Sequence, residues 1–329
     1  MTKPISTKII VISISGIILL TLMAVSIFTY YSLFGAPQKQ AESERFIVSL
    51  NAETQDTIQK LHEQGFIKSE WGFNYALKGN EIQPGGYRVS KSMTAWEMAK
   101  ALKEPYMKWV VIPEGLRKEQ IAELIGNALG WTDQQKNEWI NKYTTMKYDE
   151  TEGVYFPDTY LLPKDETELQ IADRLRAKFN EKFQPYADKF VKENVKWTTA
   201  LKVASLVQRE AANKVDMPLI AGIIWNRLLN DPPMKLEIDA TVQYALGESG
   251  NWWPKIKPAD YKTDSTYNTY IHTGLPPHPI CNPGLDAISA TLNPTETDCL
   301  YYLHDSNGQT HCAKTYEEHK LNIEKYLKN

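Results

Sequence analysis

One uninterrupted apolar run near the start of the chain limits the folds that this sequence can adopt. Residues 9–34 contain no charged side chain, and as a helix a run of this length crosses the roughly 30 Å hydrocarbon core of a bilayer. Lys3 and Lys8 precede the run, and Tyr30 and Tyr31 lie near its far end. This arrangement agrees with the positive-inside rule and with the aromatic belt of membrane helices. We therefore expect a single membrane-spanning helix, with the rest of the chain outside the cytoplasm.

A cleaved signal peptide is the alternative interpretation of this segment. The apolar region of a signal peptide is usually only about 7 to 15 residues long. The sequence Leu-Phe-Gly-Ala at residues 33–36 is also a poor cleavage signature. The length of the run therefore favours an uncleaved anchor in the cytoplasmic membrane.

The composition indicates a folded chain and excludes one class of partner. The 329 residues are 42% apolar and 23% charged, enough for two or three small domains with cores of their own. The formal net charge of -3 supplies no positive field for a phosphate backbone. Nucleic acid is thus excluded as a partner.

Cysteine and histidine usage predicts neither a metal nor another cofactor. Cys281, Cys299 and Cys312 are too few for a disulfide framework, and their spacing is not that of metal ligands. The six histidines are scattered, and we expect those near the C-terminus to be surface or structural residues; these are His304, His311 and His319.

Cys299 and Cys312 flank two strand-like runs, residues 300–303 and 310–313, joined by a turn at residues 305–308. If this hairpin forms, the two thiols approach each other in an oxidising compartment. The sequence leaves open whether they form a disulfide.

The hydropathy pattern predicts an α+β chain with five parts. We expect a cytoplasmic tip and anchor at residues 1–35, a linker at 36–45, a small α+β module at 46–105, a connecting segment at 106–149 and a larger mixed α+β domain at 150–329. Within the module we expect strands near 46–50 and 85–89 and helices near 54–64, 70–77 and 94–102. Further along we expect a strand at 108–113 and helices near 117–128, 166–179, 197–212 and 217–229, followed by the terminal hairpin.

The helix expected at residues 197–212 carries the most informative acid, Glu210. Val203, Leu206 and Val207 precede it by seven, four and three positions, so the carboxylate shares their apolar face. Burial disfavours a charged carboxylate and raises its pKa, which keeps the group protonated and able to donate a proton. Glu210 is therefore a candidate acid catalyst.

A structural role for Glu210 fits the same pattern. Lys202, Ser205 and Arg209 form a more polar stripe of this helix, so Glu210 does not simply belong to a solvated face. A buried glutamate neutralised by an arginine such as Arg227 satisfies the spacing equally well. Spacing alone does not separate the two interpretations.

Polar residues, prolines and glycines gather downstream of this helix. They lie at residues 226–227, 239–244, 267–270, 274–280 and 282–284. This density predicts a rigid, non-repetitive loop region, where binding groups are commonly displayed. Its tyrosines and asparagines suit sugars, because they offer flat apolar faces together with hydrogen-bonding groups. An ordinary long loop produces the same pattern.

Motifs of other reaction classes are missing from the sequence. It contains no Gly-x-Ser-x-Gly elbow, Walker loop, His-Glu-x-x-His helix or Gly-x-Gly-x-x-Gly fingerprint. Serine hydrolases, P-loop nucleotide enzymes and zinc peptidases of the common types therefore have no support.

Several stretches, in the same order, resemble the endolytic murein transglycosylases of MltG type, the YceG-like family. These stretches are residues 152–160, 204–210, 221–228, 239–247, 267–270, 274–277, 279–284 and 314–319. The segment Gln83-Pro-Gly-Gly-Tyr-Arg-Val89 resembles the LysM-like module that precedes the catalytic domain in this family. The resemblance covers most of the chain beyond the apolar run.

The resemblance implies cleavage of the β-1,4 bond between N-acetylmuramic acid and N-acetylglucosamine within nascent peptidoglycan strands. It further implies that Glu210 serves first as acid and then as base, which gives 1,6-anhydro ends and terminates the strands. Most glycosidases need two carboxylates. This sequence departs from the commonest Ser-x-x-Glu-x-Glu pattern of the family, because Gln208 occupies the first acidic position. Gln208 is thereby excluded as the acid.

Eight polar residues of the matching stretches are candidates for substrate binding: Asn226, Arg227, Asp239, Thr241, Tyr244, Tyr267, Asn268 and Asn282. Three of them, Asn226, Asp239 and Tyr267, are candidates for orienting Glu210 as well. Trp252 and Trp253 fit a saccharide platform and a loop anchor equally well.

Two further functions stay open. One is a non-catalytic wall-binding scaffold, in which Glu210 is structural. The other is a hydrolase that uses Asp239 together with Glu210. The resemblance also implies peptidoglycan synthases as partners, although no residue identifies which synthase.

Overall fold

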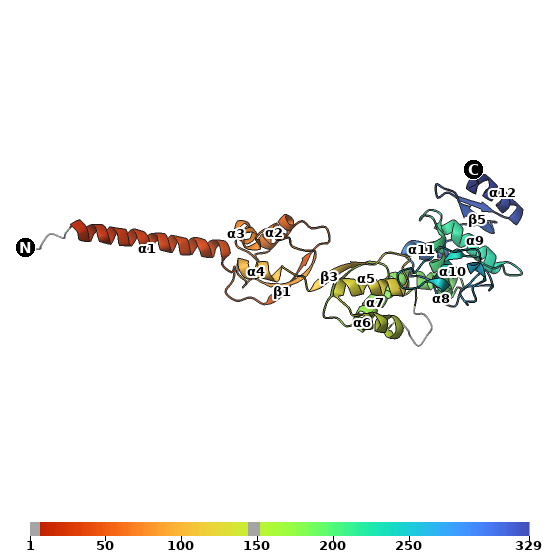
Figure 1. Ribbon diagram of the computed structural model, residues 1–329, viewed down its shortest axis with the longest axis horizontal. Coiled ribbons are helices and arrows are strands. Elements are labelled where there is room, and N and C mark those ends of the chain that lie inside the picture. Colours follow the sequence, from red (N-terminus) through yellow and green to blue (C-terminus); the bar gives the residue numbers. More distant parts are fainter. Residues whose placement is uncertain (1–6, 144–151, 329) are drawn as a thin grey trace, which may run out of the picture. The chain divides into compact units, whose positions relative to one another are not determined.

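The structure is a mixed α+β fold in which an apolar N-terminal helix precedes the sheets and the remaining helices (Figure 1). It is a computed structural model that describes residues 7–143 and 152–328. The chain divides into one unit formed by Met1–Trp109 with Leu161–Asp165 and another formed by Val110–Tyr160 with Glu166–Asn329. The α+β class is confirmed. Residues 1–6 of the tip and anchor expected at 1–35, and the domain boundary expected between residues 149 and 150, lie outside the described residues.

Helix α1 spans Thr7–Phe34 and corresponds to the apolar run. Its segment Ser13–Phe34 has a mean hydropathy of 2.0, and only 6% of it is buried. Within the described part of the chain it is the one helix long and apolar enough to cross a membrane. Length and composition fit both a membrane anchor and a signal sequence.

The first unit packs three short helices against a sheet. The strands follow the order β1-β2-β3-β4 and span Ser43–Val48, Gly85–Ser90, Met107–Val111 and Thr159–Pro163. Strands β3 and β4 each contain residues of both units. Strands β1 and β2 are antiparallel, with Phe46 opposite Tyr87. The helices α2, α3 and α4 span Thr54–Glu63, Glu70–Leu77 and Ala95–Ala101. Ile58, Leu61 and Met98 join the two aromatic residues in the core.

Helix capping accounts for the starting points of α3 and α4. The Ser69 hydroxyl accepts a hydrogen bond from the Gly72 N–H at the start of α3. Thr94 and Glu97 form a capping box at the start of α4. Both helices therefore begin where the sequence supplies a side chain for the unpaired N–H groups of the first turn. The three helices predicted in this region are confirmed.

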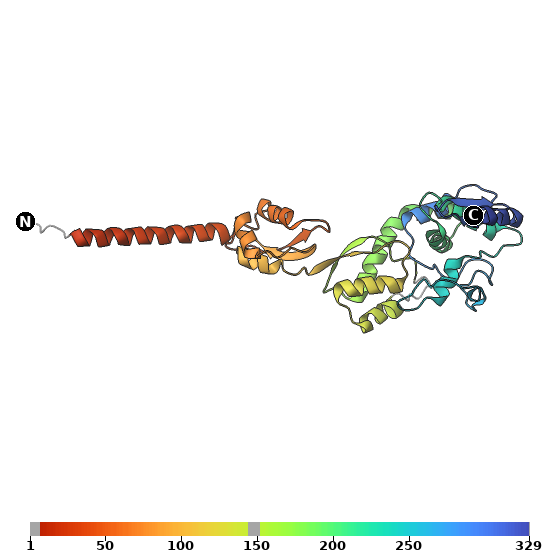
Figure 2. The ribbon, with the colours of Figure 1, turned by 45° about the horizontal axis from the view of Figure 1, so that its top comes forward.

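The second unit is built mainly from helices (Figure 2). They are α5 (Lys118–Leu129), α6 (Asp133–Glu138), α7 (Glu168–Lys192), α8 (Trp197–Glu210), α9 (Met217–Leu229), α10 (Asp239–Leu246), α11 (Leu285–Leu292) and α12 (Tyr316–Leu327), with a π-helical turn at Trp139–Tyr143 and a 3-10 turn at Asp260–Lys262. Helix α8 contacts α7, α9, α10 and α11 and lies at the centre of the unit. The helices predicted for α5, α8 and α9 are confirmed.

Residues 239–244 were expected in a rigid loop, and this prediction is wrong. They form most of α10, whose buried Ala240, Thr241 and Val242 pack within the unit. A helix of two turns shows little periodicity in the sequence, and tertiary packing stabilises it instead. Helix α7 is also longer than predicted, because Phe183 and Phe190 continue its buried stripe past Phe179.

The predicted C-terminal hairpin is confirmed. Strands β5 (Tyr301–His304) and β6 (Thr310–Ala313) are antiparallel, and Tyr302 lies opposite Cys312. A disulfide links Cys299 to Cys312, with their Cα atoms 5.8 Å apart. The hairpin is thus closed covalently at the end away from its turn.

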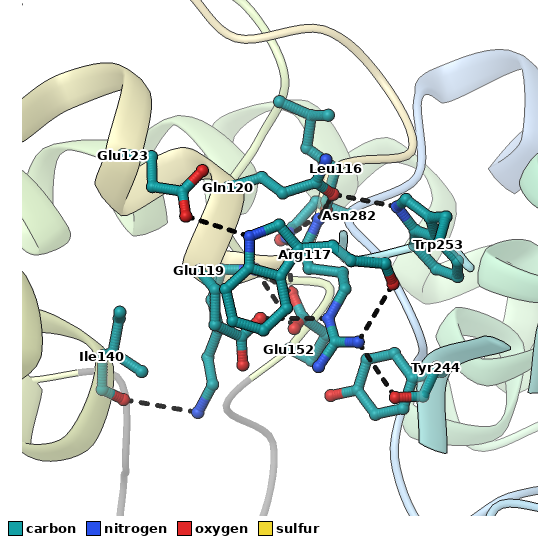
Figure 3. A network of polar contacts seen from close by, with 12 residues as sticks. Leu116, Arg117, Glu119, Gln120, Glu123, Ile140, Glu152, Tyr244, Trp253 and Asn282 are labelled. Atoms are coloured by element: carbon teal, nitrogen blue, oxygen red, sulfur yellow. Dashed lines mark hydrogen bonds and ion pairs between the residues drawn. The ribbon is translucent and has the colours of Figure 1, made fainter. Parts of the chain in front are cut away.

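A buried polar network connects three separate segments of the second unit (Figure 3). The Asn282 side chain is fully buried and donates to the Leu116 carbonyl at 3.0 Å and to the Glu152 carboxylate at 2.6 Å. Its oxygen accepts from the Tyr155 N–H at 2.8 Å. Glu152 also accepts from the Lys118 N–H at 3.0 Å. Asn282 therefore holds the start of α5 against two loops.

Replacing Asn282 with alanine is expected to lower the free energy of unfolding by about 1 to 3 kcal/mol, because it removes the acceptor of the Tyr155 N–H and a donor to the buried Glu152 carboxyl group. Urea denaturation followed by circular dichroism measures the change. The matched control is Asn293→Ala, an exposed asparagine whose amide bonds only the Ser289 carbonyl, with an expected change within about 0.5 kcal/mol. Equal stabilities of the two variants would contradict the assignment.

Candidate active site

Helix α8 places Glu210 at the end of a buried segment. Val203, Leu206 and Val207 are all 0% exposed, which confirms the predicted apolar face. Glu210 is the last residue of the helix and is half-buried. Ala211 follows with extended backbone angles, φ -65 and ψ 134, so the helix ends there. The Glu210 carboxylate therefore lies at the boundary between the packed core and the pocket that it lines.

Ser205 was expected on a polar stripe, but it is fully buried. Its hydroxyl donates to the Lys202 carbonyl at 2.7 Å and accepts from the Ile280 N–H at 3.1 Å. Gln208 accepts from the Gly284 N–H at 3.0 Å. Both side chains thus tie the helix to the segment at residues 280–284.

Glu210 lines a pocket of about 620 Å³ whose wall is polar and aromatic. The other lining residues are Arg209, Arg227, Leu236, Glu237, Asp239, Ala240, Gln243, Tyr270, Tyr301, Tyr302, Tyr316 and His319. Rings, guanidinium groups and carboxylates in one pocket suit a polar ligand with apolar faces, as a sugar has.

Two donors hold the Glu210 carboxylate. The Tyr302 hydroxyl donates to Oε2 at 2.6 Å, and the Ala240 N–H in the first turn of α10 donates as well. Burial and the neighbouring carboxylate raise the pKa of Tyr302 well above its usual range, so its hydroxyl stays protonated. Tyr302 therefore orients Glu210 from the terminal hairpin.

The pKa of Glu210 is raised above its ordinary value. Desolvation is the largest cause, and the negative charge of Asp239 acts in the same direction. The hydrogen bonds from Tyr302 and Ala240 and the nearby His304 lower the pKa and offset part of this effect. A carboxyl group with a raised pKa remains protonated closer to neutral pH and can act as a general acid.

A second carboxylate lies in the same pocket and also pairs with a tyrosine. The Tyr270 hydroxyl donates to Asp239 Oδ1 at 2.6 Å. The Tyr270 ring packs on Tyr261, with ring centroids 4.4 Å apart. Asp239 itself is exposed. The pocket thus presents one half-buried acid and one solvated acid.

Arg227 lines the pocket but does not neutralise Glu210, so the interpretation that pairs these two residues is wrong. Arg227 is 7% exposed, and its guanidinium group donates to three carbonyls, those of Leu300 at 2.5 Å, Lys235 at 3.1 Å and Leu236 at 2.8 Å. These bonds are made by Nε and Nη1 and join α9 to the hairpin and to the loop before α10. Glu210 bonds Tyr302 instead.

The structure brings Glu210, Arg227 and Asp239 together, whereas the other predicted site residues lie outside the pocket lining. Asn226 donates to the carbonyls of Thr297 and Cys299 at 2.6 and 3.1 Å. It lines a separate cavity of about 520 Å³ with residues 294–298. Asn226 therefore fixes the segment that leads into the hairpin.

Thr241 and Asn268 are both fully buried. The Thr241 hydroxyl donates to the Ile238 carbonyl at 2.7 Å. Asn268 donates to the carbonyls of Tyr261 and Thr263 at 3.1 and 2.9 Å. With Asn282, described above, these side chains satisfy local backbone groups of loops and short helices.

Tyr244 and Tyr267 belong to an aromatic cluster around Arg117, and Figure 3 shows Tyr244 and Trp253 beside this arginine. Their ring centroids are 4.7 Å apart, and the Arg117 guanidinium lies 4.0 Å from the Tyr244 centroid. The Trp252 and Trp253 N–H groups donate to Glu123 and Gln120 of α5 at 3.0 and 2.9 Å. Guanidinium groups also lie over both indoles, Arg117 over Trp252 and Arg209 over Trp253. This geometry favours the loop-anchor interpretation of the two tryptophans.

Sequence reasoning missed the tyrosines that line the pocket. Tyr301, Tyr302 and Tyr316 come from the C-terminal segment, about ninety residues or more beyond Glu210, and no spacing rule connects positions so far apart. Tyr270, Tyr316 and His319 lie in stretches that carry the family resemblance, which was the available signal. The described residues contain no group of three His, Cys, Asp or Glu side chains that could hold a metal ion.

Known proteins resemble this chain over most of its length. A model of the YceG-like family matches residues 46–325. An endolytic murein transglycosylase of Bacillus subtilis (strain 168) is 31% identical over 293 residues, which cover 81% of this chain and 80% of that relative. An endolytic murein transglycosylase of Streptococcus pneumoniae serotype 2 is 27% identical over 331 residues and 87% of this chain. The chain spans only 59% of the length of that pneumococcal relative.

A solved structure is similar as well. The crystal structure of a yceG-like protein from Listeria monocytogenes superposes with a TM-score of 0.59 at 27% sequence identity. The match covers 86% of this chain and 99% of the Listeria chain.

Replacing Tyr302 with phenylalanine is expected to raise the pKa of Glu210 further, because it removes a hydrogen bond that favours the carboxylate. Titration of the Glu side-chain carboxyl signals by ¹³C NMR, with Glu210→Gln to assign the signal, measures the shift. Tyr326→Phe serves as the control, since Tyr326 stacks on His311 and does not line the pocket. An unchanged or lowered pKa in Tyr302→Phe would show that Tyr302 does not set the acidity of Glu210.

Proposed function

The chain belongs to the YceG-like family, and from this membership we propose that it is an endolytic transglycosylase, a lyase that cuts peptidoglycan strands at internal bonds. The relatives from Bacillus subtilis and Streptococcus pneumoniae are endolytic murein transglycosylases. The observation that carries the proposal is Glu210, a half-buried acid with a raised pKa at the wall of a polar, tyrosine-lined pocket. Its substrate is the glycan of nascent peptidoglycan.

Glu210 serves as acid and base in turn. As the protonated acid it donates to the glycosidic oxygen between N-acetylmuramic acid and N-acetylglucosamine, and the bond from that oxygen to the anomeric carbon breaks. The resulting carboxylate takes the proton of the muramic C6 hydroxyl, whose oxygen bonds to the anomeric carbon. The products are a new N-acetylglucosamine end and a 1,6-anhydro end, and Glu210 regains its proton. The cut terminates the strand.

The neighbours of Glu210 support both steps. Tyr302 and the Ala240 N–H hold the carboxyl group in one orientation, so little reorganisation accompanies proton transfer. Desolvation and Asp239 keep the acid protonated before cleavage. The negative charge of Asp239 also favours the positive charge that develops at the anomeric carbon in an oxocarbenium-like transition state.

Of the eight candidates for substrate binding, Arg227 and Asp239 are the two that line the pocket, and we assign substrate contact to them. We add Tyr270, Tyr301 and Tyr316, whose rings line the same wall. Tyrosine rings bind sugar faces and their hydroxyls bond sugar hydroxyls. The remaining six, Asn226, Thr241, Tyr244, Tyr267, Asn268 and Asn282, act in this proposal by holding the elements of the site in place.

A hydrolase is the second candidate, because Asp239 and Glu210 line one pocket. In that reaction Asp239 activates a water molecule or forms a covalent intermediate. The two mechanisms differ in their products, since only hydrolysis incorporates an oxygen atom of water into the new reducing end. Digestion in ¹⁸O-labelled water therefore separates them.

We further propose that α1 anchors the chain in the cytoplasmic membrane and that the remainder acts outside the cytoplasm. In this scheme residues 36–45 are a linker, 46–105 a LysM-like module that binds glycan, 106–149 a connecting segment and 150–329 the catalytic domain. The disulfide between Cys299 and Cys312 supports an oxidising location. Peptidoglycan synthases are the proposed partners, because they supply nascent strands.

Glu210→Gln is expected to reduce glycan cleavage by about 10²- to 10⁴-fold, the usual contribution of a general acid or base. Nascent glycan is digested with each protein, and mass spectrometry quantifies the products with anhydro ends. Glu248→Gln is the matched control, an exposed glutamate outside the pocket, and should cleave like the unaltered protein. Full activity of Glu210→Gln would exclude Glu210 from catalysis, and reducing ends without anhydro sugar would favour the hydrolase.

The uncleaved anchor predicts that the chain expressed in bacteria remains in the membrane fraction after alkaline extraction, because α1 crosses the bilayer. Intact-mass measurement of the extracted protein should give an N-terminus upstream of residue 13, the start of the apolar span. A protein released by alkali whose N-terminus lies beyond Phe34 would identify the segment as a signal peptide.

A further inference from the structure

Aromatic side chains surround the C-terminal end of α1. The Phe34 ring lies 6.4 Å from Trp71 and 6.0 Å from Tyr75 of α3, and it stacks on Trp96 of α4 at 5.5 Å between centroids. Trp71 and Tyr75 also stack on each other at 5.8 Å. We name Trp71, Tyr75 and Trp96 the juxtamembrane patch. The patch extends the aromatic end of α1 onto the folded part of the first unit.

The outer members of this patch face solvent although they are large and apolar. Trp71 is 64% exposed and Tyr75 is 61% exposed. Both lie one helical turn apart on α3, so they present one continuous face. Contiguous exposed apolar surface of this kind marks an interaction site.

Close packing between α3 and α1 fixes the position of the patch along the axis of α1. A Cβ atom added at Gly72 would lie 2.3 Å from the Leu33 carbonyl oxygen, so α3 approaches the backbone of the last turn of α1 more closely than any larger residue allows. The Lys68 ammonium group lies 3.4 Å from the Tyr31 carbonyl at the same helix end, where a cation is favourable. Trp71 is therefore held level with the last turn of the apolar helix.

The last turn of α1 is the point at which a membrane-spanning helix would leave the hydrocarbon core. The apolar span ends at Phe34, and tryptophan and tyrosine concentrate at membrane interfaces because their rings are apolar and their N–H or O–H groups remain hydrated. The patch has this composition and lies at this position.

The charge beside the patch fits an anionic lipid surface. A groove of about 770 Å³ adjoins Trp96 and is lined by Lys78, Lys100 and Lys103, with Glu81 as its one acidic residue. The Lys78 ammonium group lies 6.0 Å from the Trp96 ring centroid. Lysines close to a membrane surface are attracted to anionic headgroups.

We propose that the juxtamembrane patch is a membrane-contact surface, with Trp71 and Tyr75 in the headgroup region of the bilayer that α1 spans and the lysine groove against anionic headgroups. The proposal rests on the proposed anchor role of α1 and is independent of the catalytic step. It makes the first unit a module docked on lipid, whose orientation to the membrane is set by α3 as well as by α1.

The test uses the full chain in nanodiscs of phosphatidylglycerol, with and without a lipid that is spin-labelled near its headgroup and quenches tryptophan fluorescence. Trp71→Phe is expected to lose about half of the lipid-dependent quenching, since Trp71 and Trp96 are the tryptophans that contact Phe34 at the membrane end of α1. Trp197→Phe is the control, because Trp197 is also exposed, at 41%, but belongs to the second unit. Its quenching should equal that of the unaltered chain.

The alternative outcomes are distinct. Equal quenching of Trp71→Phe and the unaltered chain would place Trp71 in water and overturn the proposal, leaving a protein partner as the occupant of the patch. A chain that does not assemble into nanodiscs would overturn both the anchor and this surface. Cleavage of soluble glycan fragments, measured on the same samples, tests the proposed enzyme separately and is expected to be unchanged in Trp71→Phe.

Discussion

The burial of α8 determines where the acid of the candidate site lies. Its neighbours α7, α9 and α11 enclose the apolar side of the helix, and Val203, Leu206 and Val207 are inaccessible to solvent. Complete burial of an aliphatic side chain of this size contributes about 1.5 to 3 kcal/mol. Rotating or sliding α8 would expose these side chains, so the last residue of the helix has one position. The pocket forms around a fixed carboxylate.

The acidity of that carboxylate is a balance between opposing effects. Desolvation and Asp239 disfavour the charged form, whereas Tyr302, Ala240 and His304 favour it. A group that must first release a proton and later accept one needs both influences, because either alone would hold it in a single protonation state. The pairing of Asp239 with Tyr270 keeps the second carboxylate fixed near the first. The proposed chemistry thus depends on tyrosines from two different parts of the chain.

The sequence predicts best those helices and strands whose ends are marked by capping or turn residues. The bounds of α3 and α9 and the pairing of the hairpin follow from caps, periodicity and turn residues. Helix α10 escaped prediction because its two turns derive their stability from packing, and α12 because its residues are largely exposed and lack a clear apolar stripe. Spacing also identified Glu210, since an acid on an apolar helix face is a local pattern.

Other residues of the candidate site lie far from Glu210 in the sequence. Tyr302 lies 92 residues after Glu210, and only the folded chain brings the two together. Asparagines and threonines in segments expected to be irregular were predicted to bind substrate. Asn268 and Thr241 instead donate hydrogen bonds to nearby backbone carbonyls. A sequence does not distinguish a polar side chain that faces a ligand from one that closes a turn.

The position of Tyr302 on the terminal hairpin gives the site an order of assembly. A ribosome produces Glu210 well before Tyr302, so α8 and its core can pack while the donor for the carboxylate has not yet been synthesised. Tyr302 reaches Glu210 only as β5, opposite Cys312 and next to the disulfide, takes its place. A chain that stops before the hairpin therefore contains the acid without the group that orients it.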